Sequence, residues 1–318
     1  MLKPEKLRKN DKVAIVAPSM AAKKDTVNKA AEMVRKLGLE PVVYKSCYLI
    51  DDEKNVSDKL RADDINHAFK DNSIKGIISL KAGYGTQSLL NFIDYEVIKE
   101  NPKVFIGFSD ITALHLALNK LCNMVSFHGP LATSRIYKKD KSGFEFDQYT
   151  YDYLYKNLFE DKPLGIIQNP QNENLDCLYA GVANGQLIGG NLTLLVKTLG
   201  TKYEIETKGR ILFIEDMGET LDNIYNMLTQ LEDAKKFEDC SGVILGTWIR
   251  CGEEYSNENE RQEKLKEIFN KVLVKYRKPV LLNLRGGHNV PMITLPFGVN
   301  VVIDAEERQI NFTEGACR

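Results

Sequence analysis

The sequence predicts an α/β fold with two domains, on the basis of three observations. Short apolar runs alternate with helix-like segments along the first half of the chain, which is typical of a parallel sheet covered by helices on both faces. The length of 318 residues corresponds to about two domains at ~150 residues each. The second half has a different pattern of predicted elements, with glycine-rich turns, amphipathic helices and a terminal hairpin. We therefore expect a parallel-sheet N-terminal domain and a mixed α/β C-terminal domain.

In the first half, apolar runs predict strands and the segments after them predict helices. The expected strands are 13–17, 41–44, 76–80 and 104–107, with a further strand-like segment at 124–127. The expected helices are 26–37 (stopped by Gly38), 57–69, 87–92 and 111–122. This order predicts a flavodoxin-like sheet, in which ligands bind beyond the carboxyl ends of the strands. The charged, glycine-containing segment Lys138–Asp147 predicts a surface excursion.

The segment 168–176, QNPQNENLD, is polar, contains one proline and has no periodicity. It predicts a linker between a domain at 1–167 and a domain at 177–318. In the second domain, the expected strands are 185–189, 210–214 and 242–246, and the expected helices are 192–199, 221–231 and 265–276. The last part, 299–303 and 309–312, predicts a β-hairpin.

Composition excludes several classes of function. Lys plus Arg number 43 and Asp plus Glu number 44, for a net charge of −1, which argues against nucleic-acid or membrane-surface binding. No apolar run approaches the ~18 residues of a membrane span, and the charged start lacks the apolar core of a signal peptide. The six cysteines are scattered without a CxxC pair, and zinc-site spacing and the Walker A pattern are absent. We expect a cytoplasmic protein without a metal site.

The segment VFIGFSDIT places Ser109 between a predicted strand and a predicted helix. It resembles the Gly-x-Ser-x-Gly nucleophile elbow, except that Ile111 stands where the second glycine would be. Backbone N–H groups at such a helix start can stabilise an oxyanion. Alternatively, Ser109 or Asp110 caps the helix. Spacing leaves both interpretations open.

A serine nucleophile needs a base, and the chain has four histidines. His67 lies on the polar face of a predicted helix, and His115 lies on the apolar stripe of another, which favours a packed core histidine. His128 follows a strand-like segment in a loop context and could line a pocket. His288 lies in the glycine-rich loop Arg285-Gly-Gly-His-Asn289, where a histidine is a good candidate base.

The third member of such a site would be an acid that orients the imidazole. Glu215 and Asp216 end the predicted strand 210–214, so either could serve. Each could also be a surface residue or a helix cap.

The segment Lys81-Ala-Gly-Tyr-Gly-Thr-Gln-Ser88 follows a predicted strand and opens a predicted helix. A dinucleotide-binding fingerprint would need a third glycine where Ser88 stands, and an earlier strand. A glycine turn that offers backbone N–H groups to an anion or oxyanion fits at least as well.

Taken together, these segments resemble the LD-carboxypeptidase family of serine peptidases, which also includes microcin-immunity peptidases. The resemblance runs nearly end to end, through VAIVAPS, KAGYGTQSLL, VFIGFSDITALH, SFHGP, GQLIGGNLTLLVKTLGT, GRILFIEDMGE, IYNMLTQL and GGHNVPMITLPFG. It implies a catalytic triad of Ser109, Glu215 and His288, with the serine in the N-terminal domain and the other two in the C-terminal domain. It also implies a homodimer.

The resemblance implies a serine carboxypeptidase that needs no metal or cofactor and removes the terminal D-alanine from an L-centre of a murein tetrapeptide, a step of peptidoglycan recycling. The N–H of Asp110 and an N–H of the Gly83–Gly85 turn would form the oxyanion hole. Lys81, Tyr84 and His128 would contact the muropeptide substrate. Lys81 stands where the family often has arginine, and a lysine cannot make the bidentate fork of a guanidinium.

Two alternatives stay open. One is a microcin-immunity-type peptidase of the same fold, which cleaves a peptidyl or aminoacyl nucleotide. The other is a non-catalytic protein that binds a ligand in the same cleft. The run EDMGETLDNIYNMLTQL looks more like the carboxypeptidase branch.

Overall fold

The structure is a computed structural model that describes residues 1–48, 56–140 and 143–318. The chain divides into two units. Unit 1 comprises Met1–Lys162, Thr294–Gly298 and Gly315–Arg318, and unit 2 comprises Pro163–Ile293 and Val299–Glu314. The segment 168–176, expected as a linker, lies inside unit 2, after strand β8 (Gly165–Ile167) and up to the first residue of β9 (Asp176–Tyr179).

The sheet of unit 1 has the strand order of flavodoxin. Its parallel strands are β1 (Lys12–Val16), β2 (Glu40–Val43), β3 (Ile74–Ser79), β4 (Val104–Gly107) and β5 (Ser126–His128), arranged β2-β1-β3-β4-β5. This confirms the predicted fold class for the N-terminal half. The order reverses between β1 and β3, and such a switch point is where parallel α/β sheets bind ligands.

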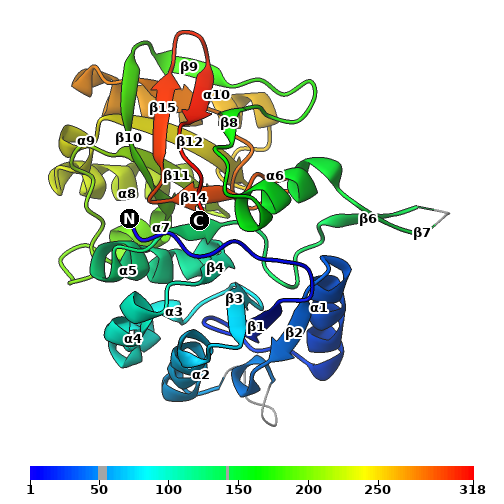
Figure 1. The fold of residues 1–318 in the computed structure, drawn as a ribbon. Helices are drawn as coiled ribbons and strands as arrows, with labels where there is room; N and C mark the ends of the chain where they lie inside the picture. The colour runs from blue at the N-terminus through cyan, green and yellow to red at the C-terminus, as the bar shows by residue number, and fades with distance from the viewer. Residues whose placement is uncertain (49–55, 141–142) are drawn as a thin grey trace. The chain divides into compact units, whose positions relative to one another are not determined.

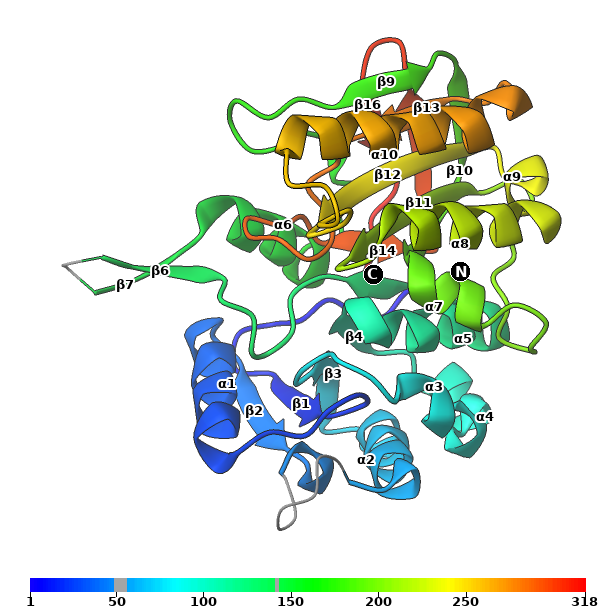
Figure 2. The same ribbon diagram turned by 180° about the vertical axis from the view of Figure 1, so that it is seen from behind.

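Helices lie on both sides of this sheet (Figures 1 and 2). The helices of unit 1 are α1 (Lys24–Lys36), α2 (Asp58–Lys70), α3 (Thr86–Leu89), α4 (Tyr95–Glu100), α5 (Thr112–Cys122) and α6 (Gln148–Phe159), with 3-10 turns η1 (Lys45–Cys47), η2 (Leu90–Phe92) and η3 (Ser109–Ile111). Side-chain caps define several starts: Ser57 Oγ accepts from Leu60 N at 3.3 Å ahead of α2, which satisfies a backbone donor that the helix leaves open.

A strand from the end of the chain completes this sheet. β14 (Leu295–Phe297) pairs antiparallel with β5, a pairing that the sequence did not predict. Where a surface excursion was expected at 138–147, the structure has the strands β6 (Tyr137–Asp140) and β7 (Gly143–Phe146), and residues 141–142 lie outside the described residues.

The sheet of unit 2 is mixed, as expected for the second domain. Four parallel strands form its centre: β10 (Val182–Asn191), β11 (Ile211–Met217), β12 (Gly242–Ile249) and β13 (Val280–Leu282). Antiparallel strands flank them, β9 beside β13 and the series β15 (Asn300–Asp304), β16 (Gln309–Phe312), β8 beside β10. The β15–β16 pairing confirms the predicted terminal hairpin.

The helices of unit 2 follow its parallel strands. They are α7 (Leu192–Lys197), α8 (Leu221–Asp233), α9 (Lys236–Asp239), α10 (Glu258–Leu273) and the 3-10 turn η4 (Val274–Tyr276). Of the predicted apolar stripe Leu221, Ile224, Tyr225, Leu228 and Leu231, the four aliphatic residues are buried and Tyr225 is half-buried, in agreement with their helical spacing. Among the described residues, no helix combines the length and the apolar character needed to cross a membrane.

Replacement of Phe297 by alanine should lower the free energy of unfolding by about 3–5 kcal/mol. The Phe297 side chain is fully buried, and its ring centroid lies 5.6 Å from that of His115 and 5.4 Å from that of His128. Urea denaturation followed by circular dichroism measures the change. The control is Phe92→Ala, whose ring is 51% exposed and whose removal should cost less than about 0.5 kcal/mol. An unaltered midpoint for Phe297→Ala would contradict the packing of β14 in unit 1.

Candidate active site

Ser109 stands at a sharp turn directly beyond the carboxyl end of β4. It opens η3, is half-buried, and has a φ of +63°. This left-handed conformation costs a non-glycine residue of the order of 1–3 kcal/mol and is concentrated at functional sites. It is the backbone geometry of a nucleophile elbow. Ser109 and Asp110 lie in η3, just before Ile111, which is the N-cap residue of α5.

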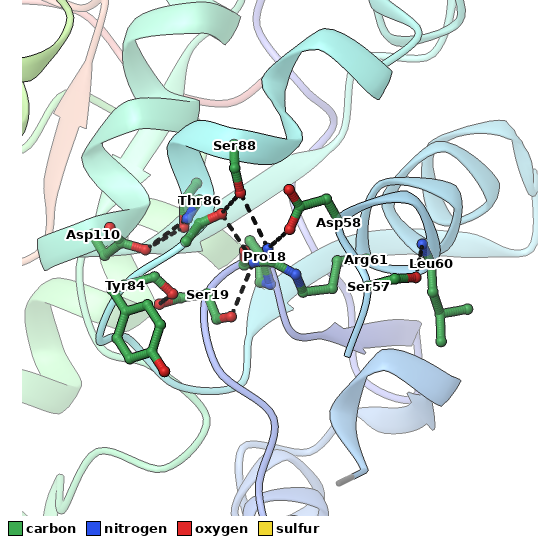
Figure 3. Close-up of polar contacts among 11 residues, drawn as sticks. Pro18, Ser19, Ser57, Asp58, Leu60, Arg61, Tyr84, Thr86, Ser88 and Asp110 are labelled. Atoms are coloured by element: carbon green, nitrogen blue, oxygen red, sulfur yellow. Dashed lines mark hydrogen bonds and ion pairs between the residues drawn. The ribbon is translucent and has the colours of Figure 1, made fainter. Parts of the chain in front are cut away.

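Asp110 joins the serine turn to the glycine turn. Its carboxylate is 6% exposed and accepts hydrogen bonds from Thr86 N at 2.9 Å and Thr86 Oγ1 at 2.7 Å (Figure 3). Thr86 is the first residue of α3 and directly follows Gly85. The residue after Ser109 is therefore bonded to the residue after the Gly83–Gly85 turn, and both lie in unit 1.

The other residues predicted to contact substrate differ in accessibility. Lys81 is exposed, and Tyr84 is 55% exposed on the glycine turn. His128 is the last residue of β5 rather than a loop residue, and it is fully buried. Its ring centroid lies 6.0 Å from that of Phe108 and 5.4 Å from that of Phe297. Contact of these three side chains with a substrate stays a prediction.

In unit 2 the predicted acid and base meet. Glu215 lies in β11 with no exposed surface, and its Oε2 is 2.7 Å from His288 Nδ1. Because an ionised carboxylate can only accept, Nδ1 carries the proton in this bond and Nε2 is the nitrogen with the lone pair. The pair has the orientation that a histidine base requires.

Close approach of the His288 loop to Glu215 depends on a glycine. Gly287 has a φ of +125°, and a Cβ there would lie 2.6 Å from Glu215 Oε2 and 2.8 Å from Thr247 Oγ1. The β11–β12 register shifts between Ile214 and Asp216, at the position of Glu215. Any larger residue at 287 would therefore push the loop away from the carboxylate.

The same loop is fastened on its other side. Thr247 Oγ1 donates to Gly286 O at 3.0 Å, and the Asn289 amide donates to Thr247 Oγ1 at 3.1 Å. Arg285 N donates to Asn169 Oδ1 at 2.9 Å. These bonds hold the backbone on either side of His288, so the imidazole is oriented before any ligand binds.

Asp216 has a structural task beside Glu215. It is 3% exposed and accepts from Asn191 Nδ2 at 2.6 Å, Thr193 N at 2.9 Å, Thr193 Oγ1 at 2.8 Å and Met217 N at 2.8 Å. Asn191 also caps α7 by accepting from Leu194 N. Asp216 thus ties the end of β11 to the start of α7, whereas Glu215 bonds His288.

Burial and charge act in opposite directions on His288. Burial alone would lower the pKa of His288, but the charge and hydrogen bond of Glu215, assisted by the charge of Asp216, raise it above its ordinary value. Burial raises the pKa of Glu215, and the imidazole opposes that rise. Burial likewise raises the pKa of Asp216 against its hydrogen bonds.

Sequence reasoning missed Arg61, which the structure shows to be buried beneath the glycine turn. The segment 57–69 was expected to have a polar face, and His67 is indeed exposed. The sequence did contain an indication that Arg61 is buried, because Arg61 lies at helical spacing from the apolar residues Ile65 and Ala68. In the parts of the chain that the structure describes, no group of three or more His, Cys, Asp or Glu side chains is placed to hold a metal ion.

Two features therefore characterise the chain. One unit carries a serine in a left-handed turn, and the other carries a buried Glu–His pair. Residues 13–129 match the LD-carboxypeptidase N-terminal domain and residues 184–303 match the LD-carboxypeptidase C-terminal domain. The chain belongs to the LD-carboxypeptidase family, which confirms the resemblance read from the sequence.

Relatives include both branches of that family. A "Probable murein peptide carboxypeptidase" of Bacillus subtilis is 30% identical, over 99% of this chain and 97% of its own. A solved structure of an MccF-like protein from Bacillus anthracis is 27% identical with a TM-score of 0.87, over 99% of this chain and all of that one. The microcin C7 self-immunity protein MccF, solved in complex with aspartyl sulfamoyl adenosine, is 26% identical with a TM-score of 0.85 over the whole of both chains.

Glu215→Gln should lower the pKa of His288 relative to the parent protein. The substitution removes the charge that raises this pKa and leaves the burial that lowers it. With four histidines in the chain, NMR titration of the imidazole protons can follow each one, and His288→Asn assigns the signal. Glu219→Gln is the control, since this half-exposed carboxylate four residues later bonds Asn223 at 3.0 Å. An equal pKa in Glu215→Gln and parent would contradict the pairing.

Proposed function

We propose that the chain is a serine carboxypeptidase that removes D-alanine from the L-centre of the diamino acid in a murein tetrapeptide. The observation that carries the proposal is the hydrogen bond between the fully buried Glu215 carboxylate and His288 Nδ1, the arrangement that orients the base in serine hydrolases. The left-handed Ser109 and the family of the chain support the same conclusion. So does the name of the Bacillus subtilis relative.

The proposed reaction divides into acylation and deacylation. Ser109 Oγ attacks the amide carbonyl, and His288 Nε2 accepts the hydroxyl proton. As the C–N bond breaks, the same nitrogen protonates the leaving D-alanine amine. The acyl group is then an ester of Ser109, which water hydrolyses with His288 again as the base. Glu215 keeps the imidazole oriented and stabilises its charged form.

The negative oxygen formed in each step needs donors. We propose the N–H of Asp110 and an N–H of the Gly83–Gly85 turn, both of which follow strands of the unit 1 sheet. Loss of one such donor typically costs about 10²–10³ in rate. Lys81 and Tyr84, both exposed, are our proposed contacts for the charged tail of the muropeptide. His128, the last residue of β5, is the third proposed substrate contact. A homodimer in the cytoplasm remains part of the same prediction.

A second candidate function is cleavage of an aminoacyl nucleotide. It is favoured by the likeness over the whole chain to MccF, whose solved complex contains aspartyl sulfamoyl adenosine. Both candidates use the same three residues. They differ in what lies beyond the scissile amide, D-alanine or a nucleotide.

The parent protein should release one alanine from L-Ala-γ-D-Glu-meso-diaminopimelate-D-Ala, and Ser109→Ala should release none. Removal of the nucleophile from a triad typically costs about 10⁶-fold in kcat, which is beyond detection in a mass-spectrometric assay of the product. The matched control is Ser73→Ala, an exposed serine ahead of β3, which should retain full activity.

Three other results would redirect the proposal. Release of alanine from the tetrapeptide by the Ser109→Ala variant would show that Ser109 is not the nucleophile. No loss by the parent, with cleavage of aspartyl sulfamoyl adenosine or a peptidyl nucleotide, would favour the second candidate function. Binding of either compound without turnover would favour a non-catalytic binding protein.

The rate should fall on the acid side of the pH profile, with a midpoint above ~6.5, the ordinary pKa of histidine. Neutral His288 is the active form, and its pKa is raised, so protonation begins to remove the base at a higher pH than for a free imidazole. The profile of kcat/KM against pH measures this midpoint. In Glu215→Gln the midpoint should move to lower pH while the maximal rate drops. A parent profile that stays level down to about pH 5 would contradict a histidine base.

A further inference from the structure

Arg61 is a fully buried arginine on α2, with 2% of its surface exposed. Its guanidinium lies at the centre of the polar cluster in Figure 3. It donates hydrogen bonds to three backbone carbonyls and two side chains: Pro18 O, Ser19 O at 3.0 Å, Gly85 O at 3.0 Å, Asp58 Oδ1 and Ser88 Oγ at 3.4 Å. One buried cation therefore bonds two separate loops.

Those two loops flank the point where the order of the unit 1 sheet reverses. Pro18 and Ser19 follow β1, and the Gly83–Gly85 turn follows β3, the strand beside it. Ser19 strengthens the connection, because its Oγ donates to Tyr84 O at 3.1 Å. The glycine turn also approaches this loop closely, since a Cβ at Gly83 would collide with the side chain of Met20. Arg61 thus holds together the two loops that border the crevice in which such sheets bind ligands.

The peptide between Gly85 and Thr86 is fixed at both of its polar ends. Its carbonyl accepts from Arg61 at 3.0 Å, and its N–H donates to Asp110 Oδ2 at 2.9 Å. The preceding carbonyl, Tyr84 O, accepts from Ser19. Because a trans peptide is planar with its C=O and N–H pointing in opposite directions, these bonds set the direction of the Gly85 N–H, away from Ser19.

The N–H groups of the turn itself are left for a ligand. Among the described residues, none of the N–H groups of Gly83, Tyr84 and Gly85 donates a hydrogen bond. The Thr86 N–H, by contrast, is used by Asp110. The turn therefore presents donors at the carboxyl ends of the strands, the edge at which Ser109 follows β4 beside β3.

We propose that Arg61 is a positioning residue for the Ser109 site: by holding Gly85 O, with Ser19 holding Tyr84 O, it aims the Gly85 N–H at the oxyanion of the reaction. This rests on the proposed function. A planar guanidinium with five donors can hold carbonyls of two loops at once, which a lysine ammonium cannot do with the same fixed geometry. Arg61 does not touch the reacting atoms, and its effect passes through the peptide planes of the turn.

The test compares Arg61→Lys with Lys103→Met. Lys103 is the matched control because it is also a buried cation in unit 1 that donates to backbone carbonyls of α2, Ala68 O at 2.9 Å and Asp71 O just after the helix. Both variants remove hydrogen bonds from a buried cation of unit 1 to backbone carbonyls, but only Arg61 bonds the glycine turn. Thermal unfolding reports the general loss of stability in each.

Two readouts separate positioning from stability. With the tetrapeptide, Arg61→Lys should lower kcat by at least about tenfold with KM changed less than about twofold, since a displacement of about 1 Å can cost 10²-fold in rate. Hydrogen exchange measured by mass spectrometry should accelerate in peptides that cover 81–88. Lys103→Met should lower the melting temperature without either effect. If Arg61→Lys fails to fold, Ser19→Ala, which frees Tyr84 O, should give the same pattern to a smaller extent.

The outcomes also separate this proposal from the proposed function. A folded Arg61→Lys with the kcat of the parent overturns the positioning role, as does an equal loss of kcat in Lys103→Met. An inactive parent overturns the proposed function. In that case, faster exchange at 81–88 in Arg61→Lys still supports the bond between Arg61 and the turn, and unchanged exchange overturns it.

Discussion

Burial of charge at the carboxyl ends of parallel strands is the constraint that shapes both units. A charge removed from water costs several kcal/mol unless donors or opposite charges surround it. Unit 1 buries Arg61 and Asp110, and unit 2 buries Glu215 and Asp216. Most of their partners belong to the loops that follow the strands and to the first residues of the next helices. The need to satisfy these charges therefore fixes the loops, which are otherwise the least constrained parts of an α/β fold.

The strained turn at Ser109 is held by its neighbours on both sides. His115 Nε2 donates to Gly107 O at 2.9 Å, two residues before the serine, and His115 Nδ1 lies 2.9 Å from Ser126 Oγ. Burial lowers the pKa of His115 to about 4, so the ring is neutral at ordinary pH and has one N–H and one lone pair for these two bonds. On the other side, Asp110 is bonded to Thr86. A left-handed serine persists where the surroundings over-determine it in this way.

The fold was predictable where the signal is local. Alternating apolar runs and helical spacing predicted the strands and helices of the flavodoxin-like half, and the terminal hairpin, because each pattern lies within one segment. β14 was not predicted, since Leu295–Phe297 pairs with a strand more than 160 residues earlier and three residues carry no periodicity. Likewise, the motifs pointed to Glu215 and His288, but only the structure shows that Asp216 turns instead to Asn191 and Thr193. The role of Arg61 depends on helix α2 meeting the loops after β1 and β3, an arrangement that no single segment of the sequence records.

Each half of the proposed chemistry is organised within its own unit. The Glu215–His288 bond and the loop bonds of Thr247 and Asn289 involve unit 2 residues. The Ser109 turn is held by unit 1 residues. In the proposed mechanism, unit 2 would set the pH at which His288 can act as the base, whereas unit 1 would set how well Ser109 and the N–H groups of the glycine turn meet the reacting carbonyl. Substitutions near Glu215 should shift the pH at which the rate falls on the acid side of the profile, because they alter the charge beside the imidazole. Substitutions near Arg61 should lower the maximal rate and leave that pH unchanged, because they do not alter this charge.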